Sequence, residues 1–321
     1  MHKYTFLQKK LHKLCLKNNI IKKSLFEIEK ILFFKKDKIN NENHIFITGL
    51  PRSGTTTLLY FLYKSNKYAS LTYKDMPFIL SPNLLSKFYK SDEIDFRERM
   101  HEDGIKYNQD SPEAFEEVFF LTFDEKEYKE NFTKYVSLIL KKYQKESYLS
   151  KNNNNYKRID LLELMFSNSN FLIPFRDPLQ HANSLLLQHI HFLHQQKEDN
   201  FILDYMNYLG HFEFGLNHKS WFMPNKFKKF DDLNYWIEQW YLFYSNLIKR
   251  YISNPNVFFV SYEKLCNEES SKNILIDKFN LQKNIDFKFN LSKKEIKNKY
   301  DSSLISECLK VYEIMTNKSL I

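Results

Sequence analysis

The segment GLPRSGTT, residues Gly49–Thr56, directly follows the apolar run HIFIT, residues His44–Thr48. The run predicts a buried strand, and the apolar spacing after the segment predicts a helix. A glycine-bounded turn between a strand and a helix cradles an anion, because backbone N–H groups converge there and the helix dipole adds positive charge. The spacing is that of a phosphate-binding P-loop, except that Thr55 replaces the lysine of nucleotide triphosphatases and Arg52 carries the charge upstream. We therefore expect the loop to hold a phosphate-like group without splitting the γ-phosphate of ATP.

Three further apolar runs predict strands at residues 68–72, 171–175 and 257–262. Long helical patterns separate them, and the clearest starts at Asp231 or Asp232, either of which can act as the N-cap. Strands that alternate with helices predict an α/β, P-loop-like three-layer fold with a central, mainly parallel sheet flanked by helices. In such a sheet ligands bind at the carboxyl ends of the strands, where the glycine-bounded loop lies.

The bulk composition narrows the class of protein. Its 321 residues are 43% hydrophobic, which permits a sizeable core without disulfides. The net charge of +9 accompanies a chain-wide abundance of lysine, so it does not indicate nucleic-acid binding. Cys15, Cys266 and Cys308 show no paired spacing, which predicts a reducing, cytoplasmic location and no structural zinc site. No run is long and apolar enough to span a bilayer, and lysines interrupt the stretch that a signal peptide needs.

The first 40 residues are expected to form a segment of their own, followed by one domain over residues 41–321. Apolar residues recur at helical spacing over residues 1–38, with lysines between them. We expect a helix that packs on the domain. The alternative is a basic amphipathic helix that makes peripheral contact with a membrane.

A second anion-binding motif is predicted at FLIPFRDP, residues Phe171–Pro178, with Ser184 following in the next helix. Arg176 ends the strand and therefore points toward the ligand crevice, although it can also simply pair with Asp177. A guanidinium group and a hydroxyl from the next helix can share one phosphate. Two anion sites on neighbouring strands indicate a ligand with two separated phosphates.

Three ordered segments together resemble the signatures of sulfotransferases that use 3′-phosphoadenosine-5′-phosphosulfate (PAPS). They are residues 51–56, residues 175–178 with Ser184, and residues 260–265, and the similarity spans about residues 44–270. The first loop is most similar to that of the bacterial and tyrosylprotein-type branch. A C-terminal Gly-x-x-Gly-x-x-Lys segment, which the cytosolic small-molecule branch uses on the 3′-phosphate, is absent from the sequence.

The resemblance implies specific roles for residues of this chain. The 5′-phosphosulfate would bind the first loop through Arg52, Ser53, Gly54, Thr55, Thr56 and Thr57. The 3′-phosphate would bind Arg176 and Ser184, with Tyr262 nearby. Tyr148–Asn152 resembles the family segment whose lysine lies beside the bridging oxygen of the donor, so Lys151 would stabilise the departing phosphate. Its alternative role is that of one more surface lysine.

The general base is expected among three residues. An in-line displacement at sulfur needs a proton acceptor within hydrogen-bond reach of the acceptor hydroxyl. The tyrosylprotein-type branch has a glutamate roughly twenty residues after the loop, and Asp75 is the acid in that region here. His101 and Glu113 are the alternatives, although Glu113, Glu116 and Glu117 also suit the first turn of a helix that starts at Ser111-Pro112.

A histidine-rich region contains His189, His191, His194, His211 and His218, together with Glu213. Its spacing does not favour a metal site, and packing or acceptor recognition is the expected role. Residues 188–230 match no general element of the fold and are predicted to shape the acceptor pocket.

The sequence as a whole predicts an enzyme that moves the sulfuryl group from PAPS to a hydroxyl or amine acceptor, leaving the product PAP and requiring no metal. A small molecule, glycan, lipid or peptide can serve as acceptor. The alternatives are a small-molecule kinase on a degenerate P-loop and a non-catalytic nucleotide-binding protein.

Overall fold

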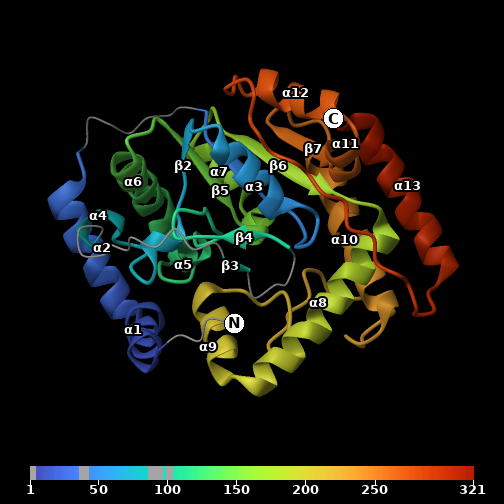
Figure 1. Ribbon diagram of the computed structural model, residues 1–321, viewed down its shortest axis with the longest axis horizontal. Coiled ribbons are helices and arrows are strands. Elements are labelled where there is room, and N and C mark those ends of the chain that lie inside the picture. The colour runs from blue at the N-terminus through green and yellow to red at the C-terminus, as the bar shows by residue number, and fades with distance from the viewer. Residues whose placement is uncertain (1–4, 36–42, 86–96, 99–103) are drawn as a thin grey trace.

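A five-stranded parallel sheet forms the centre of the computed structural model, which describes residues 5–35, 43–85, 97–98 and 104–321 (Figure 1). The strand order is β2-β5-β1-β6-β7, and every neighbouring pair is parallel. The strands are β1 (Ile45–Ile47), β2 (Tyr68–Ala69), β5 (Ser147–Lys151), β6 (Asn170–Phe175) and β7 (Val257–Ser261). The predicted α/β fold with a central parallel sheet is confirmed.

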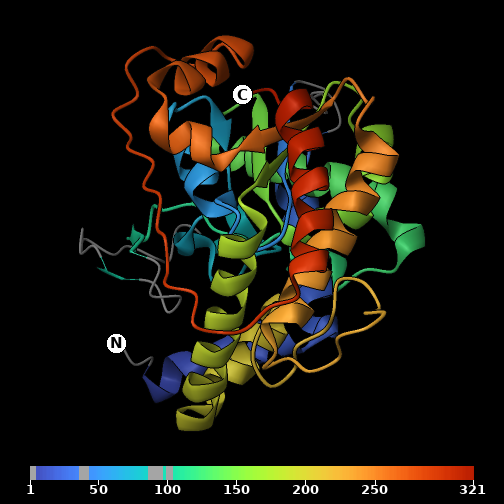
Figure 2. The ribbon, with the colours of Figure 1, turned by 90° about the vertical axis from the view of Figure 1, so that its right-hand side faces the viewer.

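Helices cover both faces of this sheet (Figures 1 and 2). Alternate side chains of β1 point to opposite faces, so Ile45 and Ile47 join one hydrophobic cluster and Phe46 joins the other. The first face carries α3 (Thr55–Lys64), α11 (Tyr262–Asn267) and α12 (Glu269–Lys278). The second carries α1 (Phe6–Lys17), α2 (Asn19–Phe33), α5 (Glu117–Phe120), α6 (Glu125–Tyr143), α7 (Ile159–Met165), α8 (Pro178–Glu198), α9 (Asn200–Leu209), α10 (Leu233–Tyr251) and α13 (Ser302–Lys318).

Short elements complete the chain. They are α4 (Pro82–Leu85), the 3-10 helices η2 (Tyr73–Asp75) and η3 (Asn153–Lys157), and a small antiparallel ribbon of β3 (Arg97–Glu98) and β4 (Lys106–Tyr107). The long helix α10 begins as predicted, because the Asp232 side chain accepts a hydrogen bond from the Asn234 backbone N–H.

Two strand predictions need correction. The run at residues 68–72 forms a strand only at Tyr68–Ala69, after which Thr72 makes an isolated bridge to Pro112. Conversely, β5 was not expected as a strand because its sequence, Ser-Tyr-Leu-Ser-Lys, carries too few apolar residues. Its pairing with β1 makes it a strand and places Lys151 opposite Ile47, next to the start of the glycine-bounded loop.

The N-terminal segment forms two helices rather than one. The Asn18 side chain ends α1 and caps α2. Phe26 is fully buried, and the Glu29 carboxylate accepts hydrogen bonds from the backbone N–H groups of Asn83 and Leu84, so the segment packs on the domain as expected. The outer side of the segment exposes four large apolar residues, Phe6, Leu7, Ile20 and Ile31. Peripheral membrane contact stays a prediction. Within the described residues, no helix has the length and apolarity needed to cross a membrane.

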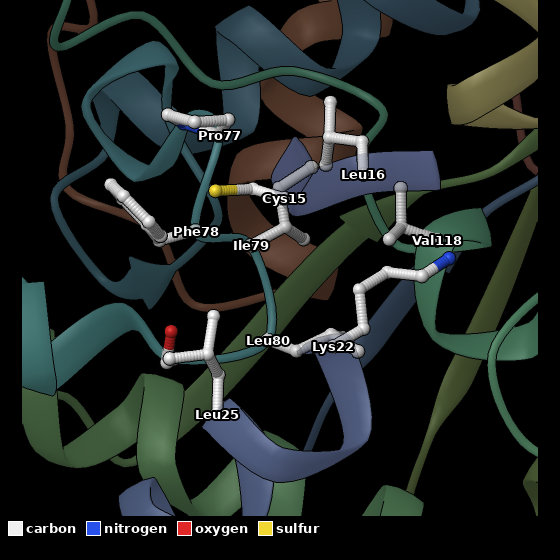
Figure 3. A pocket seen from close by; sticks show the side chains of 10 residues that line it. Cys15, Leu16, Lys22, Leu25, Pro77, Phe78, Ile79, Leu80 and Val118 are labelled. Atoms are coloured by element: carbon white, nitrogen blue, oxygen red, sulfur yellow. The ribbon is translucent and has the colours of Figure 1, made fainter. Parts of the chain in front are cut away.

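A pocket lies between this segment and residues 77–81 (Figure 3). Apolar side chains line it, together with Lys22, Cys15 and Ser81, and the space admits about one water molecule. Lys22 is buried, and its amine has no acidic partner among the described residues. Burial therefore lowers the pKa of the Lys22 amine to about 8.

We expect Lys22→Met to stabilise the protein near pH 7, by about 2 kcal/mol. The lysine has a lower pKa in the folded state than in the unfolded state, so the unfolded chain binds more protons between about pH 8 and its unfolded value of 10.5. The free energy of unfolding of the wild type should therefore rise with pH across that window. Urea unfolding at several pH values measures this, and an equal pH slope in both proteins would contradict it.

Candidate functional site

The glycine-bounded loop has an unusual backbone that only close packing can hold. Gly54 has φ 99° and Arg52 has φ 70°, both in the left-handed region. A Cβ atom on Gly54 would lie 2.2 Å from the ring of Tyr262. Inside the loop, the Ser53 hydroxyl donates to the Leu50 carbonyl at 2.8 Å. The loop is therefore fitted closely against the start of α11, as glycine alone permits.

The helix after this loop is open to a ligand at its N-terminus. Gly54 is the N-cap of α3, and among the described residues no side chain caps the first turn. The first N–H groups of a helix have no partner within it. Thr56 and Thr57 add hydroxyls that are partly exposed, whereas Thr55 is buried. This end of α3 therefore offers backbone donors, hydroxyls and the positive end of the helix dipole to an anion.

Residues that follow β6 hold the loop from the side. The Arg176 guanidinium donates to the Arg52 carbonyl at 3.1 Å, and the Arg52 Nε donates to the Ser184 hydroxyl at 3.3 Å. The His181 ring is 2.8 Å from the Pro51 carbonyl, so its Nε2 carries the proton. Burial and the nearby arginines lower the pKa of His181 to about 3, which keeps it neutral. The two predicted anion motifs thus meet at Arg52.

A coil before α13 covers the Arg176 side of the site, and the sequence did not indicate it. Figures 1 and 2 show this coil passing beside α3 and α8. The Ser292 carbonyl accepts from Arg176 at 2.9 Å, and the Asn290 carbonyl accepts from the Tyr262 hydroxyl at 3.1 Å. Asn183 donates to the Glu295 carbonyl at 3.2 Å. Residues 290–295 therefore lie where the predicted 3′-phosphate residues gather.

Arg176 itself has spare capacity for a ligand. Its Nε is buried and has no hydrogen-bond partner in the described part of the chain, since the nearest carboxylate oxygen, on Glu263, lies 4.0 Å away. Its guanidinium also lies 5.7 Å from the centre of the Tyr262 ring. A buried guanidinium N–H without a partner is costly, and an anion would satisfy it.

Lys151 lies at the carboxyl end of β5, beside β1. It is 6% exposed, so the surface-lysine alternative does not apply. Two residues further on, the Asn153 carbonyl accepts from the hydroxyl of Thr48, the residue before Gly49, at 3.3 Å. The Asn153 amide donates to Glu213 at 3.1 Å. The Lys151 segment therefore joins the loop to the histidine-rich region.

Asp75 does not fit the role of general base. Its side chain is fully buried and accepts from the Thr72 N–H and the Tyr143 hydroxyl, each at 2.7 Å, and it pairs with Lys142 of α6. Burial, and to a lesser degree the charges of Asp110 and Asp75, raise the pKa of Tyr63. Asp75 therefore lies near the end of α3 that is about 12 Å from the loop. Asp75 thus caps η2 and pairs within the core, instead of serving as the general base that the sequence suggested.

Of the two alternatives, His101 lies outside the described residues. Glu113 is 9% exposed, and its carboxylate accepts from the Tyr73 hydroxyl at 2.7 Å and the Ala114 N–H at 2.8 Å. It precedes α5, so it is not the first-turn acid that the sequence suggested. Glu116 is buried between Tyr148 and Asn155 and serves the core.

Two histidines of the histidine-rich region, His189 and His218, serve packing. The ring centroids of His189 and His218 lie 5.2 Å apart, and both rings pack on Trp236. Burial lowers the pKa of each histidine to about 4. His211 differs, because its Nδ1 pairs with Glu213 Oε2 at 3.5 Å. Within the described ranges, no group of three or more His, Cys, Asp or Glu is placed to hold a metal ion.

A family model and one solved structure agree with this architecture. A family model described as "Sulfotransferase family" matches residues 44–272. Sulfotransferase STF1 of Mycobacterium tuberculosis H37Rv superposes with a TM-score of 0.52 at 12% identity, covering 98% of this chain and 87% of that one. Sulfotransferase STF9 of Mycobacterium avium has a TM-score of 0.48 at 11% identity, over 100% of this chain and 83% of that one. No curated protein gives a significant match. At these identities the structural likeness concerns the fold alone.

Proposed function

The chain belongs to the sulfotransferase family, and we propose that it moves the sulfuryl group of PAPS to a hydroxyl or amine acceptor. The observation that carries this proposal is the meeting of two anion-binding motifs at Arg52, with Lys151 on the adjacent strand. A donor with a phosphosulfate at one end and a 3′-phosphate at the other needs two such motifs side by side.

The residues present suit this donor. The open N-terminus of α3 and the Arg52 guanidinium would hold the phosphosulfate, on a loop in which Gly54 packs too closely against the Tyr262 ring to carry a Cβ. Arg176, whose Nε lacks a partner in the described structure, and Ser184 would hold the 3′-phosphate. Tyr262 would lie between them, next to Thr57.

The same residues explain how the reaction would be promoted without a metal. The sulfuryl group carries less charge than a phosphoryl group, so fixed donors can supply the electrostatic stabilisation. Lys151 is buried, and its ammonium would stabilise charge on the departing phosphate oxygen. Arg52 and the N–H groups of α3 would stabilise charge on the oxygens around sulfur.

The acceptor stays open between a small molecule, a glycan, a lipid and a peptide. Transfer of radiolabelled sulfate from PAPS into a cell extract, followed by identification of the labelled product, tests the activity and names the acceptor. A thermal-shift comparison of PAP with ATP is the matching binding test. Stabilisation by ATP with magnesium but not by PAP would overturn the proposal in favour of a kinase.

We expect Arg176→Ala to weaken PAP binding by about 2–3 kcal/mol, the range for a hydrogen bond to a charged group. Binding of adenosine-5′-phosphosulfate, which has no 3′-phosphate, should change far less. Isothermal calorimetry measures both affinities, and Arg250→Ala, which removes an arginine paired with Asp160, is the matched control. Equal losses for the two ligands would show that Arg176 acts only by supporting the loop through the Arg52 carbonyl.

A further inference from the structure

We propose that His211, oriented by Glu213, accepts the proton of the acceptor hydroxyl during sulfuryl transfer. This proposal rests on the proposed function and assigns its missing base to residues from the histidine-rich region, outside the family's loop motifs. Three kinds of observation carry it: the position of the pair, the free nitrogen of the ring, and the charges around it.

The position follows from the end of α9. Gly210 closes that helix in the left-handed region at φ 73°, and a Cβ there would lie 2.7 Å from Glu117 Cγ. The His211 N–H donates to the Met206 carbonyl at 2.9 Å, which turns the chain back onto the domain. The turn places His211 and Glu213 against the segment that carries Lys151.

A continuous set of contacts links this pair to the loop. His211 Nδ1 lies 3.5 Å from Glu213 Oε2, and Glu213 Oε1 accepts from the Asn153 amide at 3.1 Å. The Asn153 carbonyl in turn accepts from Thr48, which directly precedes the loop. The pair is therefore fixed at the same sheet edge as Lys151.

The two nitrogens of the His211 ring differ, because Nδ1 pairs with Glu213 and Nε2 has no hydrogen-bond partner among the described residues. The Glu213 side chain is 10% exposed and the His211 side chain 23%, so the carboxylate is buried while the ring reaches the surface of the site. His211 Nε2 makes no hydrogen bond with the residues that the structure describes. A carboxylate that orients an imidazole whose other nitrogen faces substrate is the arrangement of a general base.

The charges around the pair favour a strong base. Burial alone would lower the pKa of His211, but the Glu213 carboxylate, with help from Glu113, raises it above its usual 6.5, and Lys151 opposes them. Burial would likewise raise the pKa of Glu213, but His211 and Lys151 lower it to about 2, so Glu213 stays ionised. The charge of Lys157 also lies within electrostatic reach of this carboxylate, and Lys219 lies within reach of Lys157. A base whose pKa lies near the working pH is the most effective.

The other candidates are weaker bases. Both Glu113 oxygens already accept a hydrogen bond, from Tyr73 and from its neighbour Ala114, so part of the capacity of this carboxylate to accept a proton from a substrate is already used. His189 and His218 are packed in the core with a pKa of about 4. His211 is paired with a carboxylate and lies within electrostatic reach of Lys151.

Proton transfer to His211 accompanies bond exchange at sulfur in the proposed step. The acceptor O–H gives its proton to His211 Nε2 while its oxygen forms a bond to sulfur. The bond from sulfur to the bridging oxygen of the donor breaks, and its electron pair stays on the 5′-phosphate oxygen of PAP. The Lys151 ammonium would stabilise that oxygen, so base and leaving-group partner act on opposite sides of the transferred group.

The test compares wild type, His211→Gln, Glu213→Gln and Glu113→Gln, with the exposed His194→Gln as the control. Initial rates are measured from pH 5 to 9 with radiolabelled PAPS and the cell extract as acceptor, and PAP affinity by calorimetry. Wild-type transfer establishes the proposed function independently of any variant. We expect His211→Gln to lower the rate by about 10²-fold or more, with PAP affinity within about threefold.

The pH profile of Glu213→Gln distinguishes a general base at His211 from a His211 that serves only the structure. The rate should fall as the pH falls through the raised pKa of His211, because a protonated ring cannot accept a proton. Without the Glu213 charge that pKa drops, so the acid limb of the profile should shift to lower pH, and an NMR titration of His211 should shift equally. An acid limb that does not move, or an active His211→Gln beside an inactive Glu113→Gln, would overturn the proposal.

Discussion

Gly54→Ala is expected to remove measurable PAP binding, a loss of about 10²-fold or more. The backbone at Gly54 has φ 99°, which costs an alanine about 1–2 kcal/mol. The new Cβ would also lie 2.2 Å from the Tyr262 ring, so either the loop or the tyrosine must move. Overpacking of this kind costs a further 1–3 kcal/mol or so. A displaced loop no longer points its N–H groups at the anion.

Gly104→Ala is a matched control for this change. Gly104 also has a positive φ, 75°, but a Cβ there would meet no atom of the described residues within 4 Å. This variant therefore carries the backbone strain without the collision. Calorimetry with PAP and circular dichroism of both variants would separate binding from folding. Unchanged PAP affinity in folded Gly54→Ala would show that the loop does not hold the nucleotide.

Lys151→Ala is expected to lower turnover by about 10²–10³-fold, the range for removing one preorganised donor from a developing anion. PAP binding should weaken only modestly, because the charge on the leaving oxygen develops in the transition state. Lys151→Arg should recover part of the rate, since it keeps the positive charge. Single-turnover kinetics measures the chemical step, and calorimetry measures PAP affinity.

Lys145→Ala is the control for this lysine. Lys145 lies just before β5 and donates from the surface to the Asn66 carbonyl, so its removal should leave turnover unchanged. Near-wild-type turnover in Lys151→Ala would mean that the buried ammonium serves the structure alone. A loss of PAP affinity as large as the loss of rate would place Lys151 in ground-state binding.

The main features of the fold could be predicted because their signals are local. The apolar runs that became β1, β6 and β7 are continuous in sequence. Gly54 indicates a left-handed backbone conformation that other residues avoid. Arg176 was placed correctly at a strand end, since its strand is defined by the run before it. The family match over residues 44–272 covers the same motifs.

The base could not be placed in this way. Asp75 looked suitable because it is the acid in the region where the resembling branch has its glutamate, but its partners Lys142 and Tyr143 come from a helix 67 and 68 residues further on. The packing of whole elements, here of α6 beside the Asp75 segment, determines such partners, and a local sequence pattern does not show it. The same reason hides β5, whose polar sequence becomes a strand only through its pairing with β1 and β2.

The sequence by itself determined the sheet, the glycine-bounded loop and the two anion motifs, because apolar periodicity and glycine act within a few residues. The tertiary structure alone decided what surrounds them. It brought Thr48, Asn153 and Glu213 into contact from three distant segments, paired Glu213 with His211, and laid residues 290–295 over Arg176 and Tyr262. Contacts between distant segments depend on how whole elements pack, and no local pattern encodes that packing.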